Sequence, residues 1–247
     1  MEENVRRWIE GFVKGDLWRS PLVGFCNVED VEMLRRIVSP NHLMPDEVLS
    51  TARSVIVYFI PFAEEVVRSN IGGYYSSRLW AYAYVKTNEL IVKINEYLAR
   101  KLERYGYRSA VLPPTHDFDE TRLISNWSHK HIAYLAGLGT FGVHTLIITE
   151  KGCCGRIGSL ITQAEFRYGE PLKEELCLHK RGRSCLQCMR RCKFGALNER
   201  GLDKRRCYEV LLENDRYHSD IPSLTDVCGK CCCGVPCDTQ APQFVGL

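Results

Sequence analysis

The apolar residues of the first 172 positions follow two periods along the chain. Residues 54–60 are apolar and mostly β-branched or aromatic, which is typical of a strand buried on both faces. Residues 78–105 contain neither glycine nor proline and repeat leucine and isoleucine at helical spacing, ending at Gly106, which suits a left-handed helix terminus. Alternation of such segments predicts an α/β layer.

Shorter segments complete this predicted layer. We expect helices at residues 2–13 and 28–38, a short helix after Pro45, and the end of another helix at residues 131–137. We expect strands at residues 22–26, 107–112, 143–149 and 156–162. The last two strands are expected to pair with each other through a turn at residues 150–152.

The chain has thirteen cysteines, far more than a cytosolic protein of this length would have by chance, and ten of them lie from Cys177 to Cys237. The chain begins without the apolar core of a secretory signal and contains no apolar run long enough for a membrane span, so we expect a cytoplasmic protein. In a reducing compartment, clustered thiols indicate metal ligands or redox groups.

The cysteine spacing predicts two iron–sulfur clusters. Cys185, Cys188 and Cys192 match the last three ligands of a two-cluster ferredoxin run, in which the fourth cysteine crosses to the other cluster. One [4Fe-4S] cluster is assigned to Cys177, Cys185, Cys188 and Cys237, and the other to Cys192, Cys207, Cys228 and Cys231. Cys232 and Cys233 are surplus, and either could replace Cys231 or Cys237.

Two alternatives stay open for these thiols. The pairs Cys185/Cys188 and Cys228/Cys231 could make a single zinc site, but nearly forty residues separate them and the other cysteines would be unexplained. Cys153 and Cys154, near a turn, could form a reactive pair, although we interpret them as unreactive thiols.

Charge is uneven along a chain whose net charge is only +3. Residues 180–206 contain ten lysines and arginines against two acidic residues. These cations could offset cluster thiolates, form a docking face for a low-potential electron donor such as an acidic ferredoxin or flavodoxin, or contact RNA.

A glycine-rich segment separates a predicted helix from a predicted strand at residues 128–148. Gly137, Gly139 and Gly142 have the spacing of a dinucleotide fingerprint, but the order helix-to-strand is the reverse of what that fingerprint requires. We therefore reject a Rossmann site and expect the backbone here to approach a bulky ligand closely.

Three stretches, residues 44–61, 136–161 and 177–237, together resemble the epoxyqueuosine reductase and reductive dehalogenase group of cobalamin-dependent iron–sulfur proteins. The resemblance implies a nitroreductase-like α/β (α+β) core at residues 1–172, followed at 173–247 by a bacterial two-[4Fe-4S] ferredoxin-like domain. It also implies a base-off cobalamin near Ser128, Gly137, Gly139, Gly142 and Thr145.

The sequence departs from this family in two places. Leu123 stands where epoxyqueuosine reductases have an acidic proton donor, and the C-terminal helical repeats of some members are missing. We therefore expect a short relative with another or narrower substrate. If an acid is needed, the candidates are His129, Tyr82 and Asp119, in that order.

These features predict an oxidoreductase: a cobalamin-dependent iron–sulfur reductase acting on a small molecule or a corrinoid. The alternatives are an electron-transfer or corrinoid-reducing protein without its own small substrate, and an oxidoreductase with a flavin in the core. A tRNA substrate is possible for this family but is not favoured here, and no membrane partner is expected.

Overall fold

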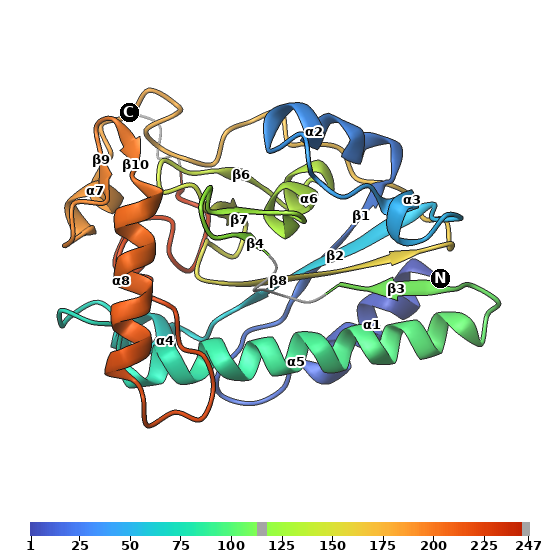
Figure 1. Cartoon of the computed structure of the whole chain (residues 1–247), viewed down its shortest axis with the longest axis horizontal. Helices are drawn as coiled ribbons and strands as arrows, with labels where there is room; N and C mark the ends of the chain where they lie inside the picture. Colours follow the sequence, from blue (N-terminus) through green and yellow to red (C-terminus); the bar gives the residue numbers. More distant parts are fainter. Residues whose placement is uncertain (113–117, 244–247) are drawn as a thin grey trace.

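A four-stranded antiparallel sheet forms the centre of the molecule (Figure 1). The structure, a computed structural model, describes residues 1–112 and 118–243. The strand order is β1–β2–β8–β3, with β1 at Leu22–Asn27, β2 at Ser54–Pro61, β8 at Gly155–Thr162 and β3 at Ser109–Val111. The long central pair, β2 and β8, is aligned from Ser54 opposite Thr162 to Pro61 opposite Gly155.

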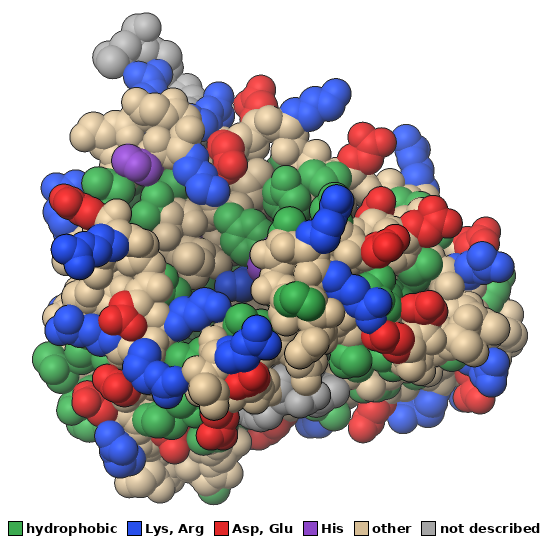
Figure 2. Space-filling view, turned by 45° about the horizontal axis from the view of Figure 1, so that its top comes forward, with side chains coloured by type: hydrophobic (Ala, Val, Ile, Leu, Met, Phe, Trp, Pro, Cys, Tyr) green, Lys and Arg blue, Asp and Glu red, His purple; other side chains and the backbone are tan. Residues whose placement is uncertain are grey.

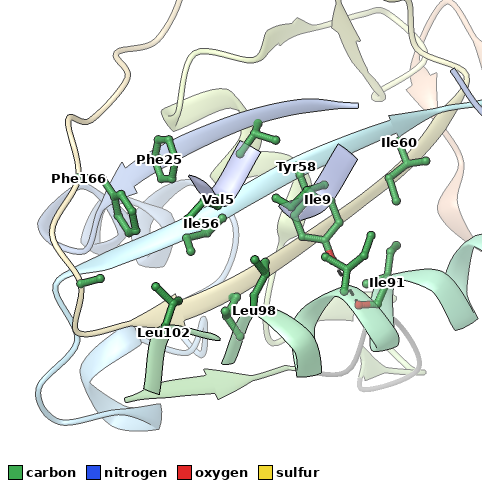
Figure 3. Packing of buried hydrophobic residues seen from close by; sticks show 14 of the residues in the cluster. Val5, Ile9, Phe25, Ile56, Tyr58, Ile60, Ile91, Leu98, Leu102 and Phe166 are labelled. Atoms are coloured by element: carbon green, nitrogen blue, oxygen red, sulfur yellow. Dashed lines mark hydrogen bonds between the residues drawn. The ribbon is translucent and has the colours of Figure 1, made fainter. Parts of the chain in front are cut away.

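Helices cover both faces of this sheet, which explains why β2 is buried along its whole length. Ile56, Tyr58 and Ile60 pack toward α1 (Glu2–Phe12) and α5 (Arg78–Glu103), as Figure 3 shows. Val55 and Val57 point the other way and pack with α6 (His129–Leu135) and the segment η1 (Glu29–Met33) to α2 (Leu34–Ile37). The predicted fully buried strand is confirmed.

The long helix α5 also agrees with its prediction. Ser77 caps its start by accepting a hydrogen bond from the Trp80 N–H, and Gly106 follows its end with φ of +85°. In its middle, Asn95 accepts a hydrogen bond from Tyr58 Oη (2.9 Å) and donates one to the Ser159 carbonyl (3.1 Å). This buried amide fixes the helix against β2 and β8.

The predicted pairing of residues 143–149 with 156–162 is wrong. The strand β7 (Ile147–Thr149) pairs instead with β6 (Gly139–Phe141), while β8 lies between β2 and β3. The reason lies in the loop before β7, where Thr145 has φ of +64° and its N–H donates to the Gly142 carbonyl, closing a β6–β7 hairpin. β8 is then available for the sheet, where its apolar residues are buried on both faces.

The remaining elements are short apart from one helix. They are α3 (Pro45–Val48), α4 (Glu64–Ser69), β4 (Phe118–Asp119), β5 (Ile124–Ser125), α7 (Gln187–Arg191), β9 (Leu197–Asn198), β10 (Gly201–Leu202) and α8 (Lys204–Tyr217). One hydrophobic cluster joins Phe62 and Ile148 to Cys177, Cys232 and Cys233, so the two predicted domains share a core. The division at residue 172 stays a prediction. Within the described part of the chain, no helix is both long and apolar enough to cross a bilayer.

Candidate redox site

The four cysteines assigned to one cluster, Cys192, Cys207, Cys228 and Cys231, lie near one another. Burial raises the pKa of Cys207, and the Cys192 thiol raises it further. Burial also raises the pKa of Cys228, to about 12, with Cys207 adding to the effect. The pKa of Cys231 is raised well above its usual value by burial and then by Cys232, Cys228 and Cys207. These interactions link the four thiols in one neighbourhood, and Cys192 and Cys231 also pack against the same hydrophobic cluster.

Three of the four cysteines assigned to the other cluster also converge. The pKa of Cys188 is raised to about 11 by burial first and then by Cys177 and Cys185. Cys237 packs against the hydrophobic cluster around Cys188, but its Sγ also lies 3.5 Å from Nε2 of His144. The ligand sets themselves stay predictions.

These surroundings fit iron–sulfur clusters. Burial opposes free thiolates, so thiolates at these positions need the positive charge of a metal. A Cβ at Gly229 would lie 2.4 Å from the Trp80 ring, so the indole packs directly on the turn between Cys228 and Cys231. The buried Trp80 Nε1–H has no hydrogen-bond partner among the described residues, and the sulfur of a cluster would be a suitable acceptor.

Cys153 and Cys154 were missed by the sequence reasoning, which interpreted them as unreactive thiols outside the site. Both are buried, and the structure places them against the C-terminal cysteines. The Sγ of Cys154 lies 3.9 Å from the Sγ of Cys233 and 3.1 Å from the carbonyl of Cys232. The sequence does contain a signal that could have linked the two pairs of cysteines, because Cys-Cys-Gly occurs at residues 153–155 and again at 232–234.

His144 is the second residue that the sequence reasoning missed. Its ligand nitrogen and the sulfurs of Cys153 and Cys237 lie within 4.8 Å of one another. The Leu146 N–H donates to His144 Nδ1 (3.1 Å), so a neutral ring carries its proton on Nε2, facing Cys237. Burial lowers the pKa of His144, but Cys153 and other thiols more than offset this and raise it overall.

The glycines predicted to lie near cobalamin are closely packed against protein atoms. A Cβ at Gly142 would lie 2.5 Å from the His144 ring, and one at Gly139 would lie 2.1 Å from the Ile148 carbonyl oxygen. Gly137 has φ of +72°, and a Cβ there would lie 2.4 Å from the Glu170 carbonyl oxygen. Any side chain at these three positions would collide with the protein itself, so each must be glycine for packing, and their contact with cobalamin stays a prediction.

Ser128, one of the two predicted cofactor-binding residues that have a side chain, belongs to a polar group at the start of α6. Its N–H donates to Nε2 of His42 (3.1 Å), and its Oγ lies 2.6 Å from Nδ1 of His131. Burial and the neighbouring Lys130 and His42 lower the pKa of His131 to about 4. His131 is therefore neutral at pH 7.

His129, the first catalytic candidate, is held by the central sheet. Its Nδ1 lies 2.8 Å from Ser159 Oγ, which also accepts a hydrogen bond from Trp127 Nε1 (3.0 Å). The next residue, Lys130, donates from Nζ to the carbonyl of Thr145 (3.2 Å). The start of α6 is thus attached to the loop that carries His144.

Tyr82 and Asp119 lie elsewhere. Tyr82 is 45% exposed on α5, which covers the face of the sheet opposite to α6, so it is not brought to His129. The exposed Asp119 accepts hydrogen bonds from the N–H groups of Thr121 and Arg122, both 2.9 Å, and so caps its own turn. Their catalytic roles stay predictions.

The basic stretch at residues 180–206 is partly paired within the protein. Lys180 and Arg181 form ion pairs with Glu175 (3.7 Å) and Glu174 (3.5 Å). Lys and Arg side chains are nevertheless frequent on the side of the molecule formed by α7 and α8 (Figure 2). A hollow of about 620 Å³ on this side is lined by Arg183, Cys185, Arg190 and other residues between 179 and 199.

No protein-family model matches the chain, and no curated protein matches its sequence. Among solved structures, an epoxyqueuosine reductase from Streptococcus thermophilus matches 100% of this chain and 69% of its own, at 14% identity and a TM-score of 0.60. One from Bacillus subtilis matches 100% and 67%, at 16% identity and a TM-score of 0.57. A catabolic reductive dehalogenase in complex with 3-bromo-4-hydroxybenzoic acid matches 85% and 28%, at 16% identity and a TM-score of 0.61.

These likenesses establish a shared fold. The neighbours are reductases from the two groups that the sequence resembles, which confirms the resemblance at the level of the fold. The chain spans about a quarter of the dehalogenase length and about two thirds of the epoxyqueuosine reductase length.

Proposed function

We propose that this protein is an iron–sulfur reductase in which two [4Fe-4S] clusters pass electrons to a cobalamin held in a nitroreductase-like core. The observation behind the proposal is the convergence of Cys192, Cys207, Cys228 and Cys231 into one group and of Cys177, Cys185 and Cys188 into another. Two groups of buried and half-buried thiols suit a two-cluster, ferredoxin-like arrangement.

The cobalamin part of the proposal is supported by the neighbours, since one dehalogenase structure is described as suggesting a mechanism for B12-dependent dehalogenation. Cobalamin, when bound, would supply redox chemistry at its cobalt. The candidate surface that would hold it is the polar group at the start of α6, which includes the predicted residue Ser128. There His131, with a pKa of about 4, accepts or donates a hydrogen bond, and His129 is the candidate proton donor.

A second candidate function is suggested by the close packing of the glycine segment against other protein atoms. If no corrin binds next to this segment, the protein would be an electron-transfer or corrinoid-reducing protein, or its core would bind flavin. A low-potential donor such as an acidic ferredoxin or flavodoxin would dock on the basic side in either case. An RNA partner is less favoured, since the acidic donor position of the epoxyqueuosine reductases is Leu123 here.

The proposal is tested by anaerobic purification with iron and sulfide analysis, and by a visible spectrum before and after adding cobalamin. About eight irons per chain with matching sulfide, together with a change to the base-off cobalamin spectrum, would support the reductase. The same iron content without a spectral change would favour the second candidate. Zinc in place of iron and sulfide would overturn both.

A further inference from the structure

Four buried cysteines remain after eight are assigned to the two clusters and Cys26 is set apart under the sheet. They are Cys153, Cys154, Cys232 and Cys233, and they come from the two Cys-Cys-Gly segments. The ligand atoms of Cys154, Cys232 and Cys233 lie within 4.8 Å of one another. Segments 79 residues apart thus bring their surplus thiols into one group.

The spacing of this group suits a single metal ion. A tetrahedral ion with metal–sulfur bonds of about 2.3 Å places its ligand sulfurs about 3.8 Å apart, and the Cys154–Cys233 distance is 3.9 Å. In a [4Fe-4S] cubane each thiolate binds a different iron, so the ligand sulfurs lie further apart. Cys153 precedes Cys154, and its sulfur lies 4.0 Å from the Cys232 carbonyl oxygen and is grouped with His144 and Cys237. A rotation of this side chain toward Cys154 would make it the fourth ligand.

One buried lysine and two half-buried arginines lie near the same thiols. The Lys230 side chain is buried, with Nζ bonded to the carbonyl (3.0 Å) and Oδ1 (3.1 Å) of Asn70. Nδ2 of Asn70 in turn lies 3.5 Å from the Cys233 sulfur. Arg191 packs over Gly234, and Arg19 interacts electrostatically with Cys154. Neutral thiols would give these cations no counter-charge, whereas a divalent ion with three or four thiolates is an anionic centre.

The neighbouring Cys231 lies between the two sets of thiols. It interacts electrostatically with Cys232 first and then with Cys228, Cys207 and Cys153, but its sulfur is not one of the three ligand atoms, of Cys154, Cys232 and Cys233, that lie within 4.8 Å of one another. We propose that Cys154, Cys232 and Cys233, with Cys153, form a third metal centre that binds one thiophilic divalent ion, Zn²⁺ or Fe²⁺. This centre is separate from the two clusters of the proposed function.

The test is metal and sulfide analysis of the full chain, purified anaerobically. We expect one ion per chain beyond the iron that matches the sulfide. Zinc would appear directly, and iron would appear as an isolated high-spin signal in electron paramagnetic resonance after mild oxidation. Cys154→Ala and Cys233→Ala should each lose this ion with sulfide unchanged, while Cys26→Ala, which removes a buried thiol outside the group, should keep it.

Two results would overturn the third centre. One is the absence of any ion beyond the cluster iron in the wild-type protein, a measurement that needs no variant and so does not depend on variants folding. The other is loss of sulfide in Cys154→Ala or Cys233→Ala, which would make these residues cluster ligands. If a Cys192→Ser variant loses cluster iron but keeps the third ion, this centre is separate from the clusters. If the chain binds the ion but contains no sulfide, only the proposed function is refuted.

Discussion

Gly152 is where the turn before Cys153 rests on the C-terminal segment. Its φ is +83°, and a Cβ there would lie 2.3 Å from the Asp238 carbonyl oxygen and 2.6 Å from the Gln240 nitrogen. The following N–H groups of Cys153 and Cys154 donate to the carbonyls of Cys237 (2.9 Å) and Asp238 (3.0 Å). Gly152→Ala should therefore disturb the contact that joins the two Cys-Cys-Gly segments.

The size of the effect can be separated into two parts with a matched control. Gly106 has φ of +85°, almost the same as Gly152, but nothing lies within 4 Å of an added Cβ. Gly106→Ala should cost about 1–2 kcal/mol for the left-handed backbone alone. Gly152→Ala should cost the same plus about 1–3 kcal/mol for displacing the backbone of residues 238–240. Replacing glycine by alanine also stabilises the protein by reducing the conformational entropy of the unfolded chain, but this effect is equal in the two variants and cancels in their comparison.

The assay is urea or thermal unfolding of both variants under anaerobic conditions, with metal content measured on the same samples. At about 2–4 °C per kcal/mol for a chain of this size, Gly152→Ala should melt roughly 2–12 °C below Gly106→Ala. It should also bind less metal at the C-terminal thiols. Equal melting temperatures and equal metal content in the two variants would refute the close approach at Asp238.

Three further predictions concern charge and proton positions. Because the pKa of His131 (about 4) lies below its value of about 6.5 in an unfolded chain, its contribution to stability should be complete above pH 6.5 and fall toward pH 4; His131→Gln should flatten this slope in urea unfolding at pH 5 and 7. Tyr84→Phe removes a 2.8 Å hydrogen bond to a carboxylate and should cost about 1–3 kcal/mol, whereas Tyr82→Phe should change stability by less than about 0.5 kcal/mol and lower turnover only if this exposed phenol supplies a proton. Reversing the charges of Arg183 and Arg190 should slow reduction by an acidic ferredoxin about 10-fold or more at low salt, with iron content unchanged; an equal rate in stopped-flow measurements would remove the basic side as the docking face.

The sequence predicts the regular elements well where burial determines them. The run at residues 54–60 and the periodic helix ending before Gly106 are both found, because each pattern matches a single way of burying its apolar side chains. The pairing of β7 was predicted wrongly because pairing depends on a turn. The left-handed backbone at Thr145, a β-branched residue, is not visible in any local propensity.

The candidate site was predicted only in part, for a similar reason. Spacing of two or three residues identifies Cys185, Cys188, Cys228 and Cys231 as probable neighbours in space without knowledge of the fold. The contacts of Cys154 with Cys233 and of His144 with Cys237 join residues far apart in the sequence. They depend on how β7 and β8 meet the C-terminal segment, which no local spacing encodes.

The thiols and the polar group at the start of α6 are connected by two short routes. Ser159, the partner of His129, lies five positions after Cys154 along β8, which corresponds to about 16 Å of extended strand. Through the loop before β7, the Thr145 carbonyl holds Lys130, and His144 in the same loop faces Cys237. Gly142 leaves the space in which the His144 ring sits, so the glycine segment shapes the loop through which the start of α6 reaches the C-terminal thiols.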